Sequence, residues 1–299
     1  MSPRLRSHFF LLIVNVIYGI NFSVAKFVMP QYIQPSGFIL LRCLGATALF
    51  WIASFFVKDK AVSKKDLGFF ALSAIFGIAI NQLLFFGGLN ITTPINGAII
   101  MVATPVLVIL MAAFLKGERI NARKITGIAL GLSGALMLLL FRGNFSFGSD
   151  TLPGDLMILG NATSYAIYLV MIKPKMAEYH TITVMRWVFL FGTIYVIPFG
   201  FTQFTAIPWA EMPPMILADT AFVVIGTTFF AYLLNNLALV HLSASVVGIY
   251  IYLQPLLASM VSMFTGQDSP TPQKALSAVL IFLGVFLVST NKVNSIKNE

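Results

Sequence analysis

Amides and phenols recur inside the long apolar runs of this sequence, at spacings that gather them on single helix faces. Residues three, four or seven positions apart share one face of an α-helix. The pattern is clearest in two runs, with Asn15, Tyr18 and Phe22 in one and Asn161, Tyr165 and Tyr168 in the other. Such groups can hydrogen-bond a small organic solute, or they can hydrogen-bond one another between helices.

A wider set of polar and aromatic residues follows the same pattern. Polar groups in hydrocarbon cost free energy unless they are paired or face water, so they concentrate inside a helix bundle. We expect a central cavity of aromatic faces with a few amides and phenols, suited to a small amphipathic solute. For each residue alone, interhelical hydrogen bonding is the alternative. The candidates are Asn15, Tyr18, Asn21, Phe22, Arg42, Asn81, Gln82, Phe85, Thr104, Asn161, Tyr165, Tyr168, Tyr232, Asn235, Tyr250 and Gln254.

Two prolines, Pro105 and Pro255, lie near the middle of two apolar runs. Proline removes a backbone donor and kinks a helix. We expect either a pair of hinges or two static kinks that shape the cavity. Glu118 and Asp268, thirteen residues after each proline, are expected at opposite membrane interfaces. Glu118 is expected either to pair with a nearby basic residue or to help close the inner side.

The elements that must position these residues are membrane-spanning helices. Of 299 residues, 58% are hydrophobic and 10% are charged, and the mean hydropathy is +0.90. A soluble domain carries about 25% charged residues, so a soluble enzyme, a disordered scaffold and a secreted disulfide framework are excluded. A spanning helix needs about 20 mostly apolar residues. The predicted spans are 8–28, 36–57, 67–89, 93–115, 125–141, 156–172, 182–205, 215–239, 243–265 and 275–291.

Lysine and arginine are distributed unequally between the two sides of these spans. With the N-terminus inside, 14 of the 19 fall in cytoplasmic segments, and only Arg142 and Lys274 fall outside. The positive-inside rule therefore predicts an N-in, C-in topology. The net charge of +9 is explained by this orientation rather than by nucleic-acid binding.

Few charges remain within the spans. Lys26 is expected to reach the outer interface and Arg186 the inner one. Arg42 is expected to pair with carbonyls or with a substrate carboxylate. Asp219 is the only carboxylate inside the predicted spans, and the histidines lie at helix ends. Because proton-coupled carriers place such groups at depth, we expect transport down a solute gradient or exchange.

The two halves of the chain repeat each other. A shift of 150 residues superimposes Pro105 on Pro255, Glu118 on Asp268 and Gly134 on Gly284. Each half, residues 1–145 and 146–299, holds five predicted spans, and an odd number makes the halves enter the membrane in opposite senses. The prediction is an all-α integral membrane protein of ten transmembrane helices, built as two inverted five-helix repeats that form one transport unit. Inverted repeats are associated with secondary transport.

Short motifs occur in a fixed order along both halves. The first half contains Tyr18-Gly19-Ile20-Asn21-Phe22 followed by Lys26, then Arg42, Pro105, and Lys116-Gly117-Glu118-Arg119 followed by Gly127 and Gly134. The second contains Gly154-Asp155, Ser164-Tyr165-Ala166, Gly226-Thr227, Ala231-Tyr232 and Pro255. Over nearly the whole chain this order resembles the drug/metabolite transporter superfamily, in its EamA-type branch. The chain departs from the family at positions 18 and 165, where tryptophan is usual, and at 268, where a second glutamate is usual.

The resemblance implies a metabolite exporter of the bacterial cytoplasmic (inner) membrane, with aromatic or other neutral amino acids and related amphipathic compounds as substrates. An organic-phosphate or nucleotide-sugar carrier, or a channel, is the alternative. The expected partners are a small-molecule substrate and the lipid bilayer, with no nucleic acid, cofactor or metal, in a monomer or weak homodimer. The sequence lacks the metal-helix, nucleophile-elbow and phosphate-loop motifs of enzymes. The Gly127-x-x-x-Gly131 spacing favours close helix packing within the monomer over a dimer contact.

Overall fold

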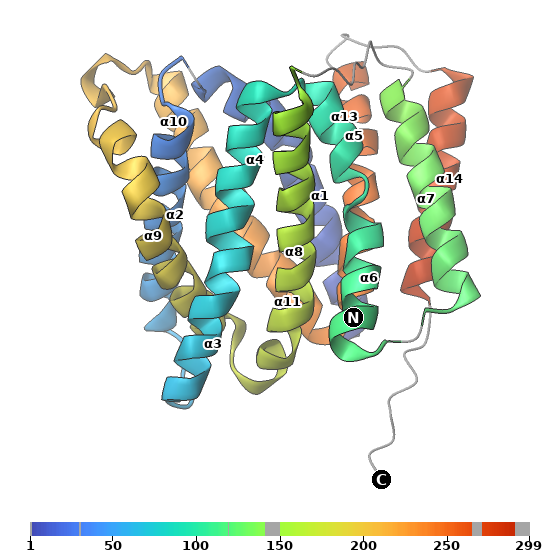
Figure 1. The fold of residues 1–299 in the computed structure, drawn as a ribbon, viewed down its shortest axis with the longest axis horizontal. Helices are drawn as coiled ribbons and strands as arrows, with labels where there is room; N and C mark the ends of the chain where they lie inside the picture. Colours follow the sequence, from blue (N-terminus) through green and yellow to red (C-terminus); the bar gives the residue numbers. More distant parts are fainter. Residues whose placement is uncertain (1, 30, 119, 141–149, 265–270, 291–299) are drawn as a thin grey trace.

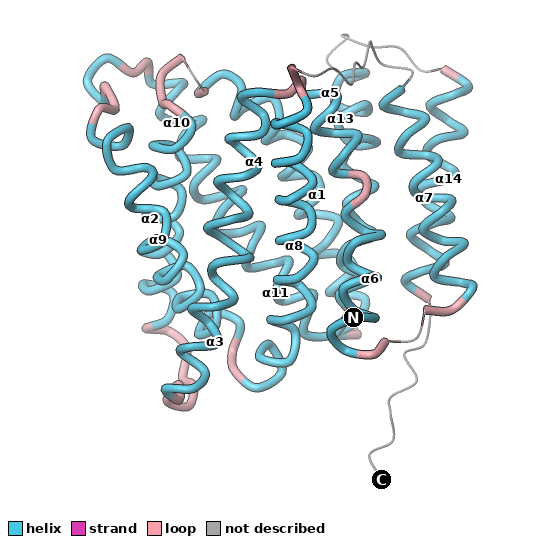
Figure 2. The backbone as a smooth tube through the Cα atoms, viewed as in Figure 1, coloured by secondary structure: helices cyan, strands magenta, loops and turns pink. Residues whose placement is uncertain are grey.

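The structure is a computed structural model that describes residues 2–29, 31–118, 120–140, 150–264 and 271–290. Within these ranges the chain consists of helices joined by short loops and contains no strand (Figure 2). The helices stand side by side in one bundle, with their connections at its two ends (Figure 1). The chain begins at one end, which we call the N-face, and we call the other end the opposite face.

The helices of the two halves have the following bounds. The first half contains α1 (Pro3–Val28), α2 (Pro35–Ser54), α3 (Lys64–Ala74), the π-helix η1 (Ile75–Ala79), α4 (Ile80–Ile91), α5 (Pro94–Met101), α6 (Thr104–Lys116) and α7 (Ala122–Leu140). The second contains α8 (Leu152–Glu178), α9 (Thr181–Thr205), the 3₁₀ turn η2 (Trp209–Glu211), α10 (Pro214–Phe222), the π-helix η3 (Val223–Phe230), α11 (Ala231–His241), α12 (Ala244–Ile249), the 3₁₀ turn η4 (Tyr250–Tyr252), α13 (Leu253–Phe264) and α14 (Pro272–Ser289).

Eight helical segments of the described chain are long and apolar enough to cross a membrane. They are Pro35–Ser54, Lys64–Ile91, Asn96–Lys116, Ala122–Leu140, Leu152–Glu178, Thr181–Thr205, Pro214–His241 and Pro272–Ser289, with a shorter apolar segment at Ala244–Leu257. The prediction of a multi-pass helical membrane protein is confirmed. The exact count of ten and the N-in, C-in orientation stay predictions.

Helix starts coincide with caps and prolines at related places in the two halves. The hydroxyl of Thr93 accepts a hydrogen bond from the amide of Asn96, and that of Ser243, 150 residues later, accepts one from the amide of Val246. Such caps satisfy amides that a helix start leaves without partners. The α4–α5 and α11–α12 turns are therefore built alike.

The packing of the helices also follows the repeat. Helix α1 packs against α11 and α13, as α8 packs against α4 and α6. Helix α2 contacts η3 and α9 contacts η1, while α2 with α9 and α7 with α14 form two further pairs. These contacts thus have counterparts in which the two halves exchange roles.

The α7–α14 pair depends on glycine. A Cβ on Gly284 would lie 2.5 Å from the carbonyl oxygen of Gly127 and 2.6 Å from the amide nitrogen of Gly131. The two backbones can approach this closely only without side chains at the crossing. The Gly127–Gly131 spacing therefore serves packing within the monomer.

The two central prolines each follow a break in a helical rod. Helix α5 ends at Met101 and α6 begins at Thr104, just before Pro105. In the second half, η4 separates α12 from α13 just before Pro255. A proline ring collides with the preceding turn and leaves a carbonyl without its donor, and the Thr104 hydroxyl donates to the Met101 carbonyl at 2.7 Å. The breaks in the helices lie where the sequence predicts kinks.

Candidate functional site

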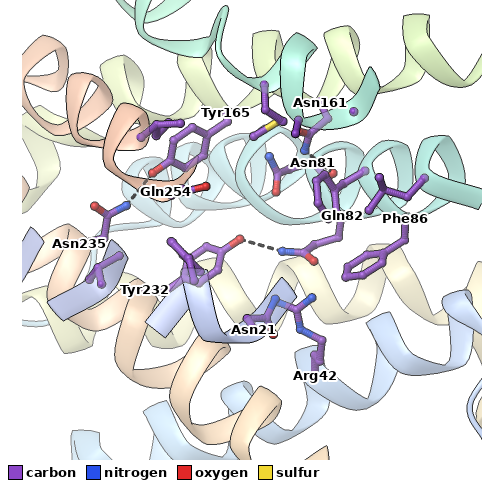
Figure 3. Close-up of a pocket in the computed structure, with 18 of the residues that line it drawn as sticks. Asn21, Arg42, Asn81, Gln82, Phe86, Asn161, Tyr165, Tyr232, Asn235 and Gln254 are labelled. Carbon is purple, nitrogen blue, oxygen red and sulfur yellow. Dashed lines mark hydrogen bonds between the residues drawn. The ribbon is translucent and has the colours of Figure 1, made fainter. Parts of the chain in front are cut away.

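A cavity of about 380 Å³ lies between the two halves. It is lined by side chains from α1, α2, α4, α5, α8, α11, α12, η4 and α13, and Figure 3 shows the polar ones projecting into a common space. The structure brings together twelve of the sixteen candidates: Asn15, Tyr18, Asn21, Arg42, Asn81, Gln82, Phe85, Asn161, Tyr165, Tyr232, Asn235 and Gln254.

The other four candidates lie elsewhere. Thr104 is buried and bonds the preceding turn of its own rod. Tyr168 is 1% exposed and donates to Asn236 Oδ1 at 3.1 Å. Tyr250 lies with its hydroxyl 2.8 Å from His8 Nδ1. The side chain of Phe22 lies outside the described residues.

Further lining residues were not among the sequence candidates. Most are apolar, and apolar positions carry no sequence signal that separates a cavity wall from a core. They are Val14, Met29, Pro35, Phe86, Leu89, Asn90, Gly97, Ala98, Met101, Val247 and Ile251. Asn90, at the end of α4, is the polar exception, and its place just before the Thr93-Pro94 break was the signal that could have marked it as the rim.

Hydrogen bonds connect the helices around the cavity, and two of the three join the two halves. Gln82 Nε2 donates to the Tyr232 hydroxyl at 2.8 Å, and these two residues are 150 positions apart, which is the repeat shift itself. Asn235 Nδ2 donates to the Tyr165 hydroxyl at 2.6 Å (Figure 3). On the other wall, Asn161 Nδ2 donates to the Asn81 carbonyl at 2.7 Å. The amides and phenols are thereby fixed in orientation before any ligand arrives.

Arg42 is the only charged side chain among the lining residues that the structure describes. It is 6% exposed, its Nε donates to the Thr228 hydroxyl at 2.9 Å, and its Cζ lies 5.2 Å from the centre of the Phe86 ring. Arg186 does not line the cavity. Its Cζ lies 5.2 Å from the Trp51 ring and 5.6 Å from the Trp187 ring.

The candidate spans contain more carboxylates than the sequence predicts. Helices α3 and α8 begin earlier than predicted and α8 ends later, so Asp66, Asp155 and Glu178 join Asp219 inside candidate spans. Asp155 is 6% exposed and accepts hydrogen bonds from Thr92 and Thr151. The statement that Asp219 stands alone was wrong, because the predicted helix start at 156 came just after Asp155.

Toward the N-face, α8 contacts both α3 and α11, and the described cavity lining contains no residue from these ends of the three helices. Lys173 Nζ donates to the carbonyls of Leu239 and Leu242 at 2.8 and 2.5 Å, at the C-terminus of α11. Lys175 pairs with Asp66 at 2.7 Å, and the Tyr179 hydroxyl donates to the same carboxylate at 2.7 Å. These bonds hold the start of α3 against the end of α8.

The opposite end of the cavity reaches the ends of helices. Met29 and Pro35, at the α1–α2 turn, line it together with Leu89 and Asn90 near the end of α4. Asn90 is exposed. The site therefore has one closed end and one end that reaches the surface.

The predicted interface charges are only partly described. Glu118 Oε2 pairs with Lys124 Nζ at 3.1 Å across the α6–α7 turn. Asp268 lies outside the described residues, as does the side chain of Lys26. Among the described residues, no three His, Cys, Asp or Glu side chains are grouped closely enough to hold a metal ion.

The chain is similar to transporters over most of its length. The model of the EamA-like transporter family matches it twice, at residues 5–140 and 152–290. It is 25% identical to an uncharacterized transporter of Archaeoglobus fulgidus, over 96% of this chain and 98% of that protein. It is 26% identical to the uncharacterized inner membrane transporter YicL of Salmonella typhimurium, over 93% of each chain.

Two further similarities concern a named exporter and a fold. The aromatic amino acid exporter YddG of Ancylobacter novellus is 25% identical, over 68% of this chain and 69% of its own length. A crystal structure superposes with a TM-score of 0.76 at 19% identity, covering 96% of both chains. The second similarity supports the fold alone.

Proposed function

Because the chain belongs to the EamA-like transporter family and is a multi-pass inner membrane protein, we propose that it exports small amphipathic metabolites by alternating access. Neutral or aromatic amino acids and related compounds are the proposed substrate class. The observation that carries the proposal is the 380 Å³ cavity, which lies between two halves related by the repeat and is closed toward one face. Pockets of this size enclose small organic molecules.

In this proposal α1 and the rod formed by α12, η4 and α13 cross the membrane with the eight candidate spans, giving ten. The two halves, 1–145 and 146–299, are inverted, and the N-face is cytoplasmic. The described state is then open toward the outside. The breaks before Pro105 and Pro255 act as related hinges that exchange the open and closed ends.

The lining favours neutral and zwitterionic solutes. Aromatic side chains, Phe85, Tyr165 and Tyr232 among them, supply flat apolar surface, and the amides supply oriented donors and acceptors. A polyvalent cation would require carboxylates, and none is among the described lining residues. A phosphate ester would require several cations, and the described lining has one.

Counterflow in proteoliposomes tests the proposal. Vesicles loaded with unlabelled solute are diluted into labelled solute, using a panel of neutral and aromatic amino acids and a panel of phosphorylated metabolites. Saturable uptake of an amino acid, absent from protein-free vesicles, is the expected result. Exchange of phosphorylated metabolites alone contradicts the proposed substrate class, and non-saturating flux indicates a channel.

A further inference from the structure

Arg42 has no acidic partner among the described residues. It lies in α2, within a candidate span, and it is almost fully buried. A buried guanidinium without a counter-charge is expensive, because the low-dielectric surroundings do not replace its hydration. Its one hydrogen bond to a described residue is the contact of Nε with Thr228. The buried guanidinium therefore lacks an anionic partner among the described residues.

The surroundings fix the orientation of the guanidinium. The Thr228 hydroxyl that accepts from Nε itself donates to the Val223 carbonyl at 2.9 Å, so it is held in place by η3. The ring of Phe86, from α4, lies against Cζ at 5.2 Å. One edge and one face are thus occupied by protein, and Figure 3 shows the guanidinium directed from α2 into the space that the other lining side chains share.

An oriented Nη edge has a specific chemical complement. The planar fork of arginine matches the two oxygens of a carboxylate, and such bidentate pairs are stronger than neutral hydrogen bonds. One cation balances one carboxylate, whereas a phosphate dianion would keep an excess charge in the cavity. Neutral amides at Asn81, Gln82 and Gln254 line the remainder and can meet the uncharged or ammonium part of a solute.

We infer that Arg42 binds the carboxylate of the transported solute and makes a carboxylate a requirement for binding. This inference rests on the proposed function and names the chemical group that its site recognises. A solute without a carboxylate leaves the buried guanidinium unpaired when the cavity closes. We expect it to bind at least about tenfold more weakly than its carboxylate counterpart.

The inference is tested first on the unmodified protein with matched solutes. One series is phenylalanine, phenylalanine amide, phenethylamine and 3-phenylpropionate, and a second series is leucine with its amide, amine and acid counterparts. Binding is measured in detergent by the shift in melting temperature with solute concentration, which does not require transport. In at least one series we expect the two carboxylates to bind at least about tenfold tighter than the amide and the amine.

Variants assign the preference to Arg42. Arg42→Gln should abolish the difference between acid and amide, while Arg42→Lys, which keeps the charge without the fork, should retain part of it. Thr228→Val leaves the charge in place and removes its anchor, so it should weaken acid binding alone. Arg186→Gln is the matched control, because Arg186 lies in a candidate span but outside the cavity lining, and it should leave the preference unchanged.

Several outcomes would overturn the inference. Equal binding of acid and amide, a preference that survives in Arg42→Gln, stronger binding of phosphorylated metabolites, or no binding of any carboxylate each contradicts it. Counterflow separates this result from the proposed function. Carboxylate-selective binding without counterflow rejects transport and keeps the role of Arg42, whereas counterflow of amines and acids alike rejects the role of Arg42 and keeps transport.

Discussion

The two ends of the cavity are built from related segments but differ in their contacts. At the N-face the ends of α8 and α11 are joined by the bonds of Lys173 to Leu239 and Leu242. At the opposite face the corresponding helices are α1 and α4, and there Leu89, the counterpart of Leu239, lines the cavity. Leu239 is fully buried. Similar sequences therefore adopt a closed arrangement at one end and an open one at the other.

This difference teaches how a repeat can encode a transport cycle. If each half can adopt the arrangement of the other, the closed end opens as the open end closes, without any new fold. Contacts at the closed end, such as those of Lys173 and Asp66, then contribute to the free-energy difference between the two states. Substitutions at these contacts and at the open rim of the cavity therefore test whether the two ends differ as described.

The largest effect is expected from filling the cavity. Ala98 lines it from α5, so Ala98→Trp should obstruct both the solute and closure of the open end. We expect counterflow to fall by at least about tenfold, since overpacking of this kind costs about 1–3 kcal/mol or more. Ala129→Trp, at an exposed position of α7, is the control and should retain activity. Equal loss in both variants would contradict the assignment of the cavity.

Two single-cysteine variants measure the difference in solvent accessibility between the two ends of the cavity. Asn90 and its repeat counterpart Val240 are replaced singly in a Cys43→Ala background, since Cys43 is the only native cysteine. In nanodiscs, where both faces are accessible, a soluble maleimide should label cysteine at 90 at least about tenfold faster than at 240, which corresponds to about 1.4 kcal/mol. Equal rates would mean that the two ends do not differ in solution.

A smaller shift is expected from weakening the N-face contacts. Asp66→Ala removes the acceptor shared by Lys175, Tyr179 and Ser63. Labelling at position 240 should increase severalfold and labelling at 90 should decrease, because the closed end loses bonds that link α3 to α8. Glu178→Gln is the control, since its bond to Lys175 lies within α8 and links no other helix. An increase at both reporters would indicate unfolding rather than a change of state.

The smallest effect on the asymmetry is expected from the α7–α14 pair. Gly284→Ala places a methyl group against the backbone of α7 and should lower stability by about 1–3 kcal/mol, seen as a lower melting temperature. The ratio of labelling at 90 and 240 should not change, because this pair contributes no residue to the cavity lining that the structure describes. Gly68→Ala, with no heavy atom within 4 Å of the added Cβ, is the matched control. A changed ratio would show that the pair takes part in the switch.

Much of the fold follows from residue type alone. Apolar length and prolines predicted where the helical rods lie, and helical spacing placed most of the amides and phenols on the cavity side. The rotation of a helix about its own axis is set by packing instead. Tyr168 shares a face with Tyr165, yet its ring enters the space above Gly77, where a Cβ would lie 2.4 Å away. The spacing of residues along one helix cannot predict this packing of Tyr168 in α8 against Gly77 in η1.

The local helix type explains why Tyr250 does not line the cavity as predicted. Tyr250 and Gln254 were placed on one face by α-helical geometry. Tyr250 begins the 3₁₀ turn η4, which winds more tightly than an α-helix and changes the direction of the side chain. Gln254 lines the cavity, and Tyr250 turns to His8 instead.

The bond between Gln82 and Tyr232 has a geometric consequence. Because each residue is the repeat counterpart of the other, exchanging the conformations of the two halves maps the pair onto itself. The hydrogen bond then joins the same two positions whichever face is open. In the proposed alternating-access cycle this pair would be a fixed point, and a solute held beside it would keep one constant neighbour from entry to release.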